Sequence, residues 1–352
     1  MTTLADVARM RLVSQRLVGP LPDAGAVVRH LTCTQGQDYP GSSTSIALRT
    51  VDRDLAGVRA AYDEGRIVRS WPMRGTLFAV AAEDLGWMLD LTAPRVLPGT
   101  DRRRAELGLD ADVLGRAEEV ARAELGSAGL TRAELLARWQ DAGLSTTDGR
   151  GYHLLFHLAV RGVICLGPTE GSGQRFVLTE EWIRAPRTLA GEEAVAEWFR
   201  RYVLSHGPVP VADFLWWTKL LKRDLAPVLA PLREELEVLD VDGVEHWVDP
   251  AVLQAYPGSK RATAAPLLLP GFDEIVLGYG DRRAVLTKEQ EARVVPGNNG
   301  VFRGTVVRAG SALGTWKRPT RTGAVVTVEP FSPPLPPVVE RALPRLTAAL
   351  PG

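Results

Sequence analysis

The sequence contains few of the residues that build disulfide frameworks or metal sites. Only two cysteines, Cys33 and Cys165, occur in 352 residues, and the five histidines show no metal-ligand spacing such as His-Glu-x-x-His. Both cysteines have apolar neighbours, which predicts buried thiols. We therefore expect a protein that works without a metal or other cofactor.

Long hydrophobic runs are also missing. No stretch of about 18 apolar residues, the length needed to cross a bilayer, is present. Residues 1–17 contain Asp6 and three arginines, where a secretion signal requires an apolar run. We expect the protein to stay in the cytoplasm, away from membranes.

The chain carries no net charge, because 42 lysines and arginines balance 42 aspartates and glutamates. That balance argues against a generally basic nucleic-acid protein. The basic residues gather locally, however, since residues 302–326 contain five of them and no acidic residue. The five are Arg303, Arg308, Lys317, Arg318 and Arg321. This cluster indicates either a surface for a polyanion or a solvated hairpin.

The composition is that of an ordinary globular protein, with 45% hydrophobic and 24% charged residues. Single hydrophobic cores stop growing at roughly 250 to 300 residues. A chain of 352 residues therefore predicts several domains.

The clearest pattern of elements lies in the middle of the chain. Thr131 and Glu134 form a capping-box signal for a helix, and an apolar helical run follows at residues 152–160. Two alternating segments, 163–166 and 175–178, then flank a Gly-rich turn and predict a β-hairpin. Helix, turn, helix and hairpin in this order is the winged-helix plan.

The same order of segments recurs on both sides. It is present within residues 4–80, and again within 194–248, where residues 224–236 are predicted to be helical and Asp242-Gly243 forms the hairpin turn. Short β-type runs, among them residues 275–277, follow after about residue 261. We predict an α+β fold of three tandem winged-helix units and a small C-terminal β-rich domain. The predicted boundaries are 1–92, 93–188, 189–262 and 263–352.

No nucleophile elbow, phosphate loop, dinucleotide fingerprint, kinase signature or zinc motif is present, which removes most common enzyme classes. The unusual segment that remains is Thr34-Gln35-Gly36-Gln37-Asp38-Tyr39-Pro40-Gly41. Pro40 favours an extended chain before it, and in an extended chain Gln35 and Gln37 lie on one face. Two amides presented together are one interpretation, and a loop whose glutamines bond to the backbone is the other.

Two amides are neither strong acids nor strong bases at neutral pH, so a reaction that they catalyse needs little proton transfer. Loss of an N7-alkylguanine from DNA meets this condition, because the alkylated base already carries positive charge and leaves as a neutral molecule. The sugar left behind resembles an oxocarbenium ion, as in glycoside hydrolysis. Amide oxygens can orient the attacking water and face that positive charge.

Five motifs in a consistent order carry a family resemblance. They are QGQDYPG at residues 35–41, WPMRGTL at 71–77, GYHLLFH at 151–157, LPGFDE at 269–274 and NGVFR at 299–303. Together they resemble the AlkZ-type DNA glycosylase family, a winged-helix family linked to azinomycin resistance. The similarity runs from residue 11 to about residue 318.

The resemblance implies a metal-free, monofunctional glycosylase for N-alkylated purines in double-stranded DNA and, in some members, for interstrand crosslinks. Its role would be DNA repair or antibiotic self-resistance, and we expect a monomer. The catalytic pair would fall on Gln35 and Gln37. The predicted DNA contacts are Asp38, Tyr39, Arg74, Thr76, His153, Arg303, Lys317 and Arg318.

Several of these residues also fit ordinary roles. Arg74 and Thr76 suit a β-strand edge as well as a phosphate contact. His153 and His157 have the spacing of metal ligands on a helix, but no third ligand is in view, which favours a packed or DNA-facing helix. The alternative for the whole chain is a noncatalytic winged-helix regulator, which dimerisation would favour, or a scaffold that binds no DNA.

Overall fold

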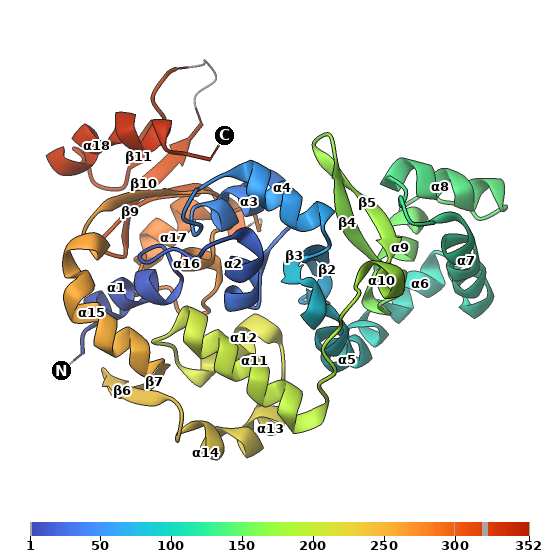
Figure 1. Ribbon diagram of the computed structural model, residues 1–352, viewed down its shortest axis with the longest axis horizontal. Coiled ribbons are helices and arrows are strands. Elements are labelled where there is room, and N and C mark those ends of the chain that lie inside the picture. The colour runs from blue at the N-terminus through green and yellow to red at the C-terminus, as the bar shows by residue number, and fades with distance from the viewer. Residues whose placement is uncertain (1, 299, 319–322, 352) are drawn as a thin grey trace. The chain divides into compact units, whose positions relative to one another are not determined.

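The computed structural model describes residues 2–298, 300–318 and 323–351. The chain forms two compact units, one made of Met1–Val58 with Val195–Gly352 and the other of Arg59–Ala194 (Figure 1). The first unit is therefore built from both ends of the chain, whereas the second is one continuous segment. Among the described residues, no helix has both the length and the apolar character needed to cross a membrane.

The first unit contains a four-stranded sheet, a two-stranded hairpin and the helices around them. Its elements are α1 (Leu4–Ser14), α2 (Ala24–Leu31), β1 (Cys33–Gln35), α3 (Tyr39–Ala47), α12 (Val211–Thr218), α13 (Lys222–Leu225), α14 (Leu229–Leu232), β6 (Glu237–Val241), β7 (Val244–Val248), α15 (Pro250–Thr263), β8 (Pro266–Leu269), α16 (Glu274–Leu277), α17 (Lys288–Val294), β9 (Gly304–Arg308), β10 (Ser311–Lys317), β11 (Thr327–Pro330) and α18 (Pro337–Ala348). Two further helices, α4 (Leu55–Asp63) and α11 (Gly191–His206), run through the sequence boundaries between the units.

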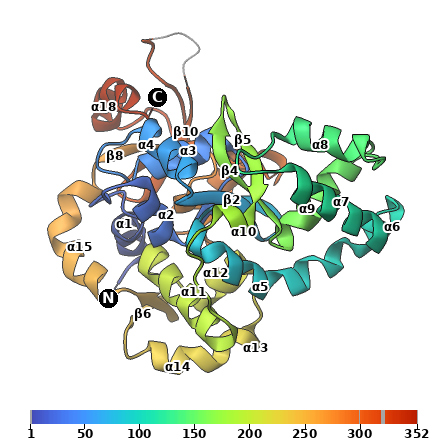
Figure 2. The ribbon, with the colours of Figure 1, turned by 45° about the vertical axis from the view of Figure 1, so that its right-hand side comes forward.

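The sheet of the first unit has the antiparallel order β11-β10-β9-β8, and its strands β8 and β9 are largely buried. Leu268 and Val306 belong to one apolar cluster with Val339 of α18, whereas Leu269 belongs to another with Leu12 of α1. Successive side chains of a strand point to opposite faces, so adjacent leucines of β8 serve both clusters. Full burial of such a side chain contributes roughly 1.5 to 3 kcal/mol. Helix α1 in turn packs along α15 (Figure 2).

The second unit combines a sheet with a group of helices. Its elements are β2 (Ile67–Met73), β3 (Thr76–Ala81), α5 (Leu85–Val96), α6 (Asp101–Glu106), α7 (Ala111–Glu124), α8 (Arg132–Asp141), α9 (Arg150–Val160), β4 (Ile164–Glu170), β5 (Gly173–Leu178) and α10 (Thr179–Trp182). The strands run antiparallel in the order β3-β2-β4-β5.

The predicted helix, turn, helix and hairpin are all present in the second unit. Thr131 and Glu134 form the expected capping box of α8, and Gly149, at φ 87°, precedes α9. Trp139 of α8 is fully buried and donates its indole N–H to the Ala117 carbonyl of α7 at 2.9 Å. A mixed helix and sheet fold is confirmed, with 51% helix and 18% strand. The three tandem winged-helix units and the four domain boundaries remain predictions.

Two segments differ from their predicted structure. Residues 275–277 form the short helix α16 and not a strand, because Asp273 caps its start by accepting a hydrogen bond from Ile275 N–H. The helical run predicted for residues 224–236 is divided into α13, a 3₁₀ turn at Ala226–Val228 and α14. Pro227 and Pro231 lie in this stretch, and proline interrupts the backbone hydrogen bonding of a helix.

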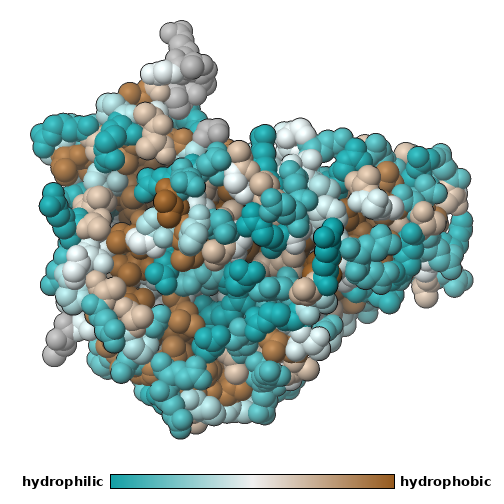
Figure 3. All heavy atoms as spheres, in the orientation of Figure 1, coloured by the Kyte–Doolittle hydropathy of each residue, from teal (hydrophilic) through white to brown (hydrophobic). Residues whose placement is uncertain are grey.

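Hydrophobic side chains on the surface are scattered. Figure 3 shows mostly hydrophilic residues on one face, with hydrophobic residues between them. The large apolar residues that are exposed include Val51, Val244 and Val301, which lie far apart in the sequence. Isolated exposed residues of this kind are normal in soluble domains and do not by themselves mark a binding site.

Candidate active site and nucleic-acid contacts

Gln35 ends strand β1 and is only 6% exposed. Its side-chain oxygen Oε1 accepts hydrogen bonds from the backbone N–H groups of Gly36 and Gln37, at 2.9 and 3.1 Å. Its own backbone N–H donates to Oε1 of Glu274 at 2.8 Å. Gln35 therefore holds the backbone of the turn that follows it.

Gln37 lies two residues further along and is exposed. Gln35 turns its amide oxygen back onto the N–H groups of its own loop. The interpretation of a loop whose glutamine bonds to the backbone holds for Gln35. Gln37 is the member of the pair that a ligand can reach.

Helix α3 begins directly after this loop. Asp38 is its N-cap residue, with extended φ and ψ of −95° and 98°, and Tyr39 already belongs to the helix. The extended chain predicted before Pro40 therefore ends one residue earlier than expected. The reason is that proline is well tolerated in the first turn of a helix, where its missing N–H has no intrahelical partner.

Two neighbouring acidic residues, Asp273 and Glu274, hold the loop on both sides. Glu274 bonds to Gln35 before the loop, and Asp273 bonds to Ser45 and Arg49 after it. The Arg49 guanidinium contacts both oxygens of Asp273, at 2.8 and 2.9 Å, and both side chains are at most 1% exposed. A bidentate pair of this kind is geometrically specific, so it fixes the end of α3 against the segment before α16.

The electrostatics beneath the loop are those of a buried, paired network. Burial acts to raise the pKa of Asp273, but the charge and hydrogen bonds of Arg49 more than offset it, so this pKa lies below its usual 3.8. His206 Nε2 lies 3.5 Å from Oε2 of Glu274, and both side chains are fully buried. Burial lowers the pKa of His206 from 6.5, which favours its neutral form at pH 7.

A pocket of about 420 Å³ opens beside the start of α3. Its lining includes Asp38 and Arg318, two predicted DNA contacts that lie far apart in the sequence. Arg318 donates to the hydroxyl of Thr44 on α3 at 3.3 Å. The fold thus brings one end of the basic cluster to the glutamine loop.

The other members of the basic cluster have different surroundings. Arg303 is exposed and donates to the Arg293 carbonyl at 3.5 Å, and Lys317 is exposed at the end of β10.

Tyr39, another predicted DNA contact, is half-buried in the first turn of α3. Arg321 and Asn299 of the NGVFR motif lie outside the described residues.

Three predicted contacts belong to the second unit. Arg74, at φ 58°, lies in the turn between β2 and β3, Thr76 begins β3, and both are half-buried. His153 is half-buried on α9, and burial lowers its pKa from 6.5, with Arg103 and Arg104 adding to the effect. One turn later, His157 Nδ1 lies 2.7 Å from Arg104 Nη1. Among the described residues, no group of three or more His, Cys, Asp or Glu side chains could hold a metal ion.

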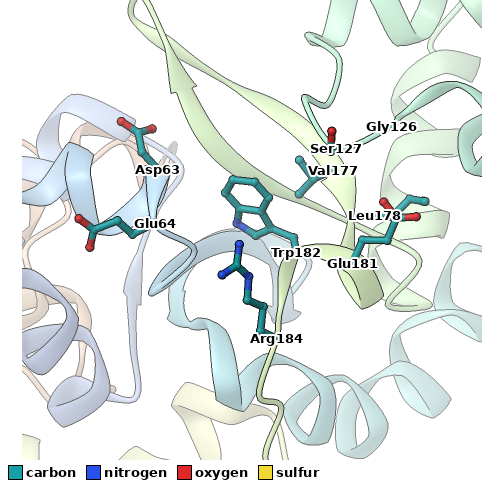
Figure 4. A pocket seen from close by; sticks show the side chains of 9 residues that line it. All are labelled: Asp63, Glu64, Gly126, Ser127, Val177, Leu178, Glu181, Trp182 and Arg184. Carbon is teal, nitrogen blue, oxygen red and sulfur yellow. The ribbon is translucent and has the colours of Figure 1, made fainter.

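A second pocket, of about 500 Å³, lies in the second unit beside Trp182. Figure 4 shows Asp63, Glu64 and Glu181 around its indole ring, with Arg184 beneath. Three carboxylates against one guanidinium repel phosphate, so this pocket does not suit a nucleic-acid backbone. No motif in the sequence predicted this pocket.

The role of Asp273 and Glu274 was also missed from the sequence. Both belong to the LPGFDE motif at residues 269–274, but nothing local shows that they bond to residues near 35 and 49. Two adjacent acidic residues after Pro270-Gly271, in an otherwise apolar stretch, were the available signal. A buried acidic pair requires partners, and these were not assigned.

The comparison with protein families decides what this site belongs to. The sequence signature of the family described as DNA glycosylase AlkZ-like matches residues 28–350. The chain belongs to this family. The predicted family and the predicted class of enzyme, a hydrolase acting on DNA, are thereby confirmed.

Individual relatives agree with the AlkZ-like assignment. The chain is 29% identical over 315 residues to the interstrand DNA cross-link repair glycosylase of Streptomyces sahachiroi, covering 84% of this chain and 82% of the relative. The solved structure of Streptomyces sahachiroi DNA glycosylase AlkZ is similar in fold, with a TM-score of 0.81 and 24% identity. That likeness covers 99% of this chain and 98% of the other.

Proposed function

We propose that this AlkZ-like protein hydrolyses the N-glycosidic bond of N-alkylated purines, of the N7-alkylguanine type, in double-stranded DNA. Gln37 orients the attacking water, and Gln35 acts as a positioning residue that keeps the loop in shape. The observation that supports this division is that the Gln35 oxygen is occupied by two backbone N–H groups while Gln37 is exposed. An exposed amide held on a rigid loop is the kind of group that can fix a water molecule.

The weak acidity and basicity of the two glutamine amides match the proposed substrate. An N7-alkylated guanine carries positive charge before the bond breaks, so it departs without protonation by the enzyme. The electrons of the C–N bond stay with the base, which leaves neutral, and the positive charge passes to the sugar. Water then adds to the sugar carbon and loses a proton, while the Gln37 amide oxygen accepts a hydrogen bond from that water.

The DNA backbone would be held by the residues predicted from the sequence. Arg303, Lys317 and Arg318 supply positive charge on the first unit, and Asp38 and Tyr39 border the loop. We propose Arg74, Thr76 and His153 as further contacts from the second unit. Phosphate contacts of this kind position the duplex and make binding sensitive to salt.

We further propose that the protein acts as a monomer in the cytoplasm, where it protects the genome from alkylation. The name of the Streptomyces sahachiroi relative supports interstrand crosslinks as a second substrate. Self-resistance in a producer of a DNA-alkylating compound is the biological role that this substrate class suggests. The competing function is a noncatalytic DNA-binding regulator, which the experiment below separates from a glycosylase.

The test measures base release from a duplex with one N7-methylguanine and from a duplex with an N7-linked crosslink. We expect the wild type to release the base and leave an alkali-labile abasic site, and Gln37→Ala to be slower by about 10² to 10³-fold. Gln254→Ala is the matched control, because Gln254 is an exposed glutamine on α15.

Gln35→Ala should also slow the reaction, through loss of the loop hydrogen bonds. Equal rates for the wild type and the Gln35→Ala, Gln37→Ala double variant would show that the assignment of the glutamines is wrong. Salt-sensitive binding of duplex DNA by a dimer, without any base release, would support the regulator instead.

A further inference from the structure

We call the pocket beside α3 the base slot. Its lining begins at Asp38, the residue that follows Gln37. It is lined by Asp38, Pro40, Gly41 and Thr44 at the start of α3, Leu55 of α4, Pro270 and Gly271 after β8, Gly304 of β9, Trp316 and Arg318 at the end of β10, and Pro351. Its volume of about 420 Å³ falls in the usual range for small-molecule pockets. All of these residues belong to the first unit.

Three glycines leave parts of the slot wall as bare backbone. A Cβ atom on Gly41 would lie 2.5 Å from Oδ2 of Asp38, and one on Gly304 would lie 2.8 Å from the indole nitrogen of Trp316. A Cβ atom on Gly271 would collide with the Phe302 carbonyl oxygen. Glycine at these positions therefore allows the segments that form the wall to pack closely against one another.

The remaining lining is largely apolar and rigid. Trp316 is 7% exposed, and its indole N–H donates to the Leu269 carbonyl at 2.7 Å, which fixes the ring in place. Leu55 and Pro270 add aliphatic surface. Aromatic and aliphatic walls of this kind suit a planar aromatic ring, which they desolvate and contact.

Two side chains of opposite charge, Asp38 and Arg318, line the slot without forming an ion pair with each other. In the described part of the chain, the Asp38 carboxylate makes no capping hydrogen bond to α3, although Asp38 is the N-cap residue, and it forms no ion pair with Arg318. Arg318 is held by the Thr44 hydroxyl at 3.3 Å and the Pro351 carbonyl at 3.0 Å. A ligand that enters the slot therefore meets one carboxylate and one guanidinium.

We propose that the base slot binds the alkylated purine while its glycosidic bond is cleaved. Asp38 faces the positive charge of an N7-alkylated ring, and Arg318 donates to an exocyclic oxygen such as O6 of guanine. The base must leave the stack to enter, as other enzymes that act on bases require. This inference rests on the proposed function, since it assigns the pocket that holds the base during the same reaction.

The experiment measures binding of nucleosides to the full chain, without DNA, by calorimetry. The probes are N7-methylguanosine, which is cationic at mildly acidic pH, and guanosine, which is neutral and nearly identical in shape. We expect the wild type to bind N7-methylguanosine about tenfold more tightly than guanosine. Asp38→Asn, which keeps the shape of the side chain, should remove this difference.

Two further variants test the position of the ligand. Leu55→Trp fills the slot and should weaken both nucleosides by about tenfold or more, and Arg318→Ala should weaken both equally because both contain O6. Leu221→Trp is the matched control, since Leu221 is 40% exposed in the same unit and does not line the slot. Circular dichroism verifies that each variant is folded.

The outcomes separate this inference from the proposed function. If the wild type releases base from DNA but binds both nucleosides equally, or if Leu55→Trp binds them as the wild type does, the slot assignment is wrong and the glycosylase assignment stands. If the nucleosides bind as expected but no base is released from DNA, the slot is supported and the proposed reaction fails.

Discussion

The backbone N–H of Gln35 donates a 2.8 Å hydrogen bond to Oε1 of Glu274, which lies 239 residues further along the chain. This bond joins the start of the glutamine loop to the residue that begins α16. Asp273, next to it, bonds to Arg49, which follows the C-terminal end of α3. The shape of the loop therefore depends on a segment from the opposite end of the sequence.

Replacing Glu274 should disturb the loop in a graded way. Glu274→Ala leaves the buried Gln35 N–H without a partner, which costs about 1 to 3 kcal/mol of stability, whereas Glu274→Gln keeps an acceptor oxygen. We expect the alanine variant to be the slower one in single-turnover base release, with DNA affinity close to that of the wild type. Indistinguishable rates for both variants and the wild type would contradict a positioning role for Glu274.

We expect the Arg49–Asp273 pair to make a contribution to the free energy of unfolding that depends on pH. The pKa of Asp273 is held below 3.8, because the charge of Arg49 outweighs the effect of burial. This stabilising contribution is therefore fully present above pH 3.8 and is lost as the pH falls through the folded-state pKa of Asp273. Asp273→Asn should cost roughly 3 to 5 kcal/mol at neutral pH, since it leaves the Arg49 charge buried and unpaired.

Urea unfolding of the wild type and of Asp273→Asn over this pH range checks the prediction. The difference in unfolding free energy should shrink below pH 3.8. A difference that stays constant through acid pH would show that the carboxylate charge is not what stabilises the pair.

His157 predicts a pH dependence in the second unit. Burial, followed by the charges of Arg104 and Arg161, lowers the pKa of His157 from 6.5 to about 4. Because the folded-state pKa is the lower one, stability is full above pH 6.5 and falls as the pH drops from 6.5 towards 4. In His157→Asn, the side-chain oxygen can replace Nδ1 as the acceptor for Arg104. Over that pH interval, the free energy of unfolding of this variant should fall by about 1 kcal/mol less than that of the wild type.

Thermal unfolding of the wild type and of His157→Asn between pH 6.5 and 4 makes this comparison. Parallel melting temperatures at every pH would mean that His157 is not responsible. Since the chain has two compact units, the transition of the second unit should be followed separately.

The basic cluster predicts a defined salt dependence of DNA binding. Lys317 is exposed at the end of β10, beside Arg318 at the base slot. If it contacts a phosphate, Lys317→Ala should reduce the slope of log Kd against log salt by about 0.9. Lys288→Ala, an exposed lysine at the start of α17, should leave the slope unchanged. A reduced slope in the Lys288 variant but not in the Lys317 variant would place the phosphate contact elsewhere.

Local signals in the sequence predicted local structure well. The Asp242-Gly243 turn joins β6 and β7 with the expected pairing, because both residues adopt positive φ, at 53° and 78°, as a two-residue hairpin requires. The capping box at Thr131 is likewise present. Residues 275–277 were assigned wrongly because a three-residue apolar run fits a strand or a helix until the cap at Asp273 is known.

The candidate site was predicted in part, for a different physical reason. The sequence singled out Gln35 and Gln37 because amides are neither strong acids nor strong bases, which limits the chemistry that they can catalyse. It did not predict that Gln35 is buried, since that burial depends on Glu274 in a distant segment. The base slot was missed for the same reason, because its walls come from segments of the first unit that lie far apart in the sequence, from Asp38 to Pro351.

The split composition of the first unit has a consequence for synthesis. The second unit is one continuous segment, Arg59–Ala194, and is translated before residue 274. During translation, the whole second unit is therefore available to fold before Glu274, the hydrogen-bond partner of Gln35, has been synthesised. The enzyme acquires its working loop only after Glu274, which lies in the last quarter of the polypeptide, has emerged.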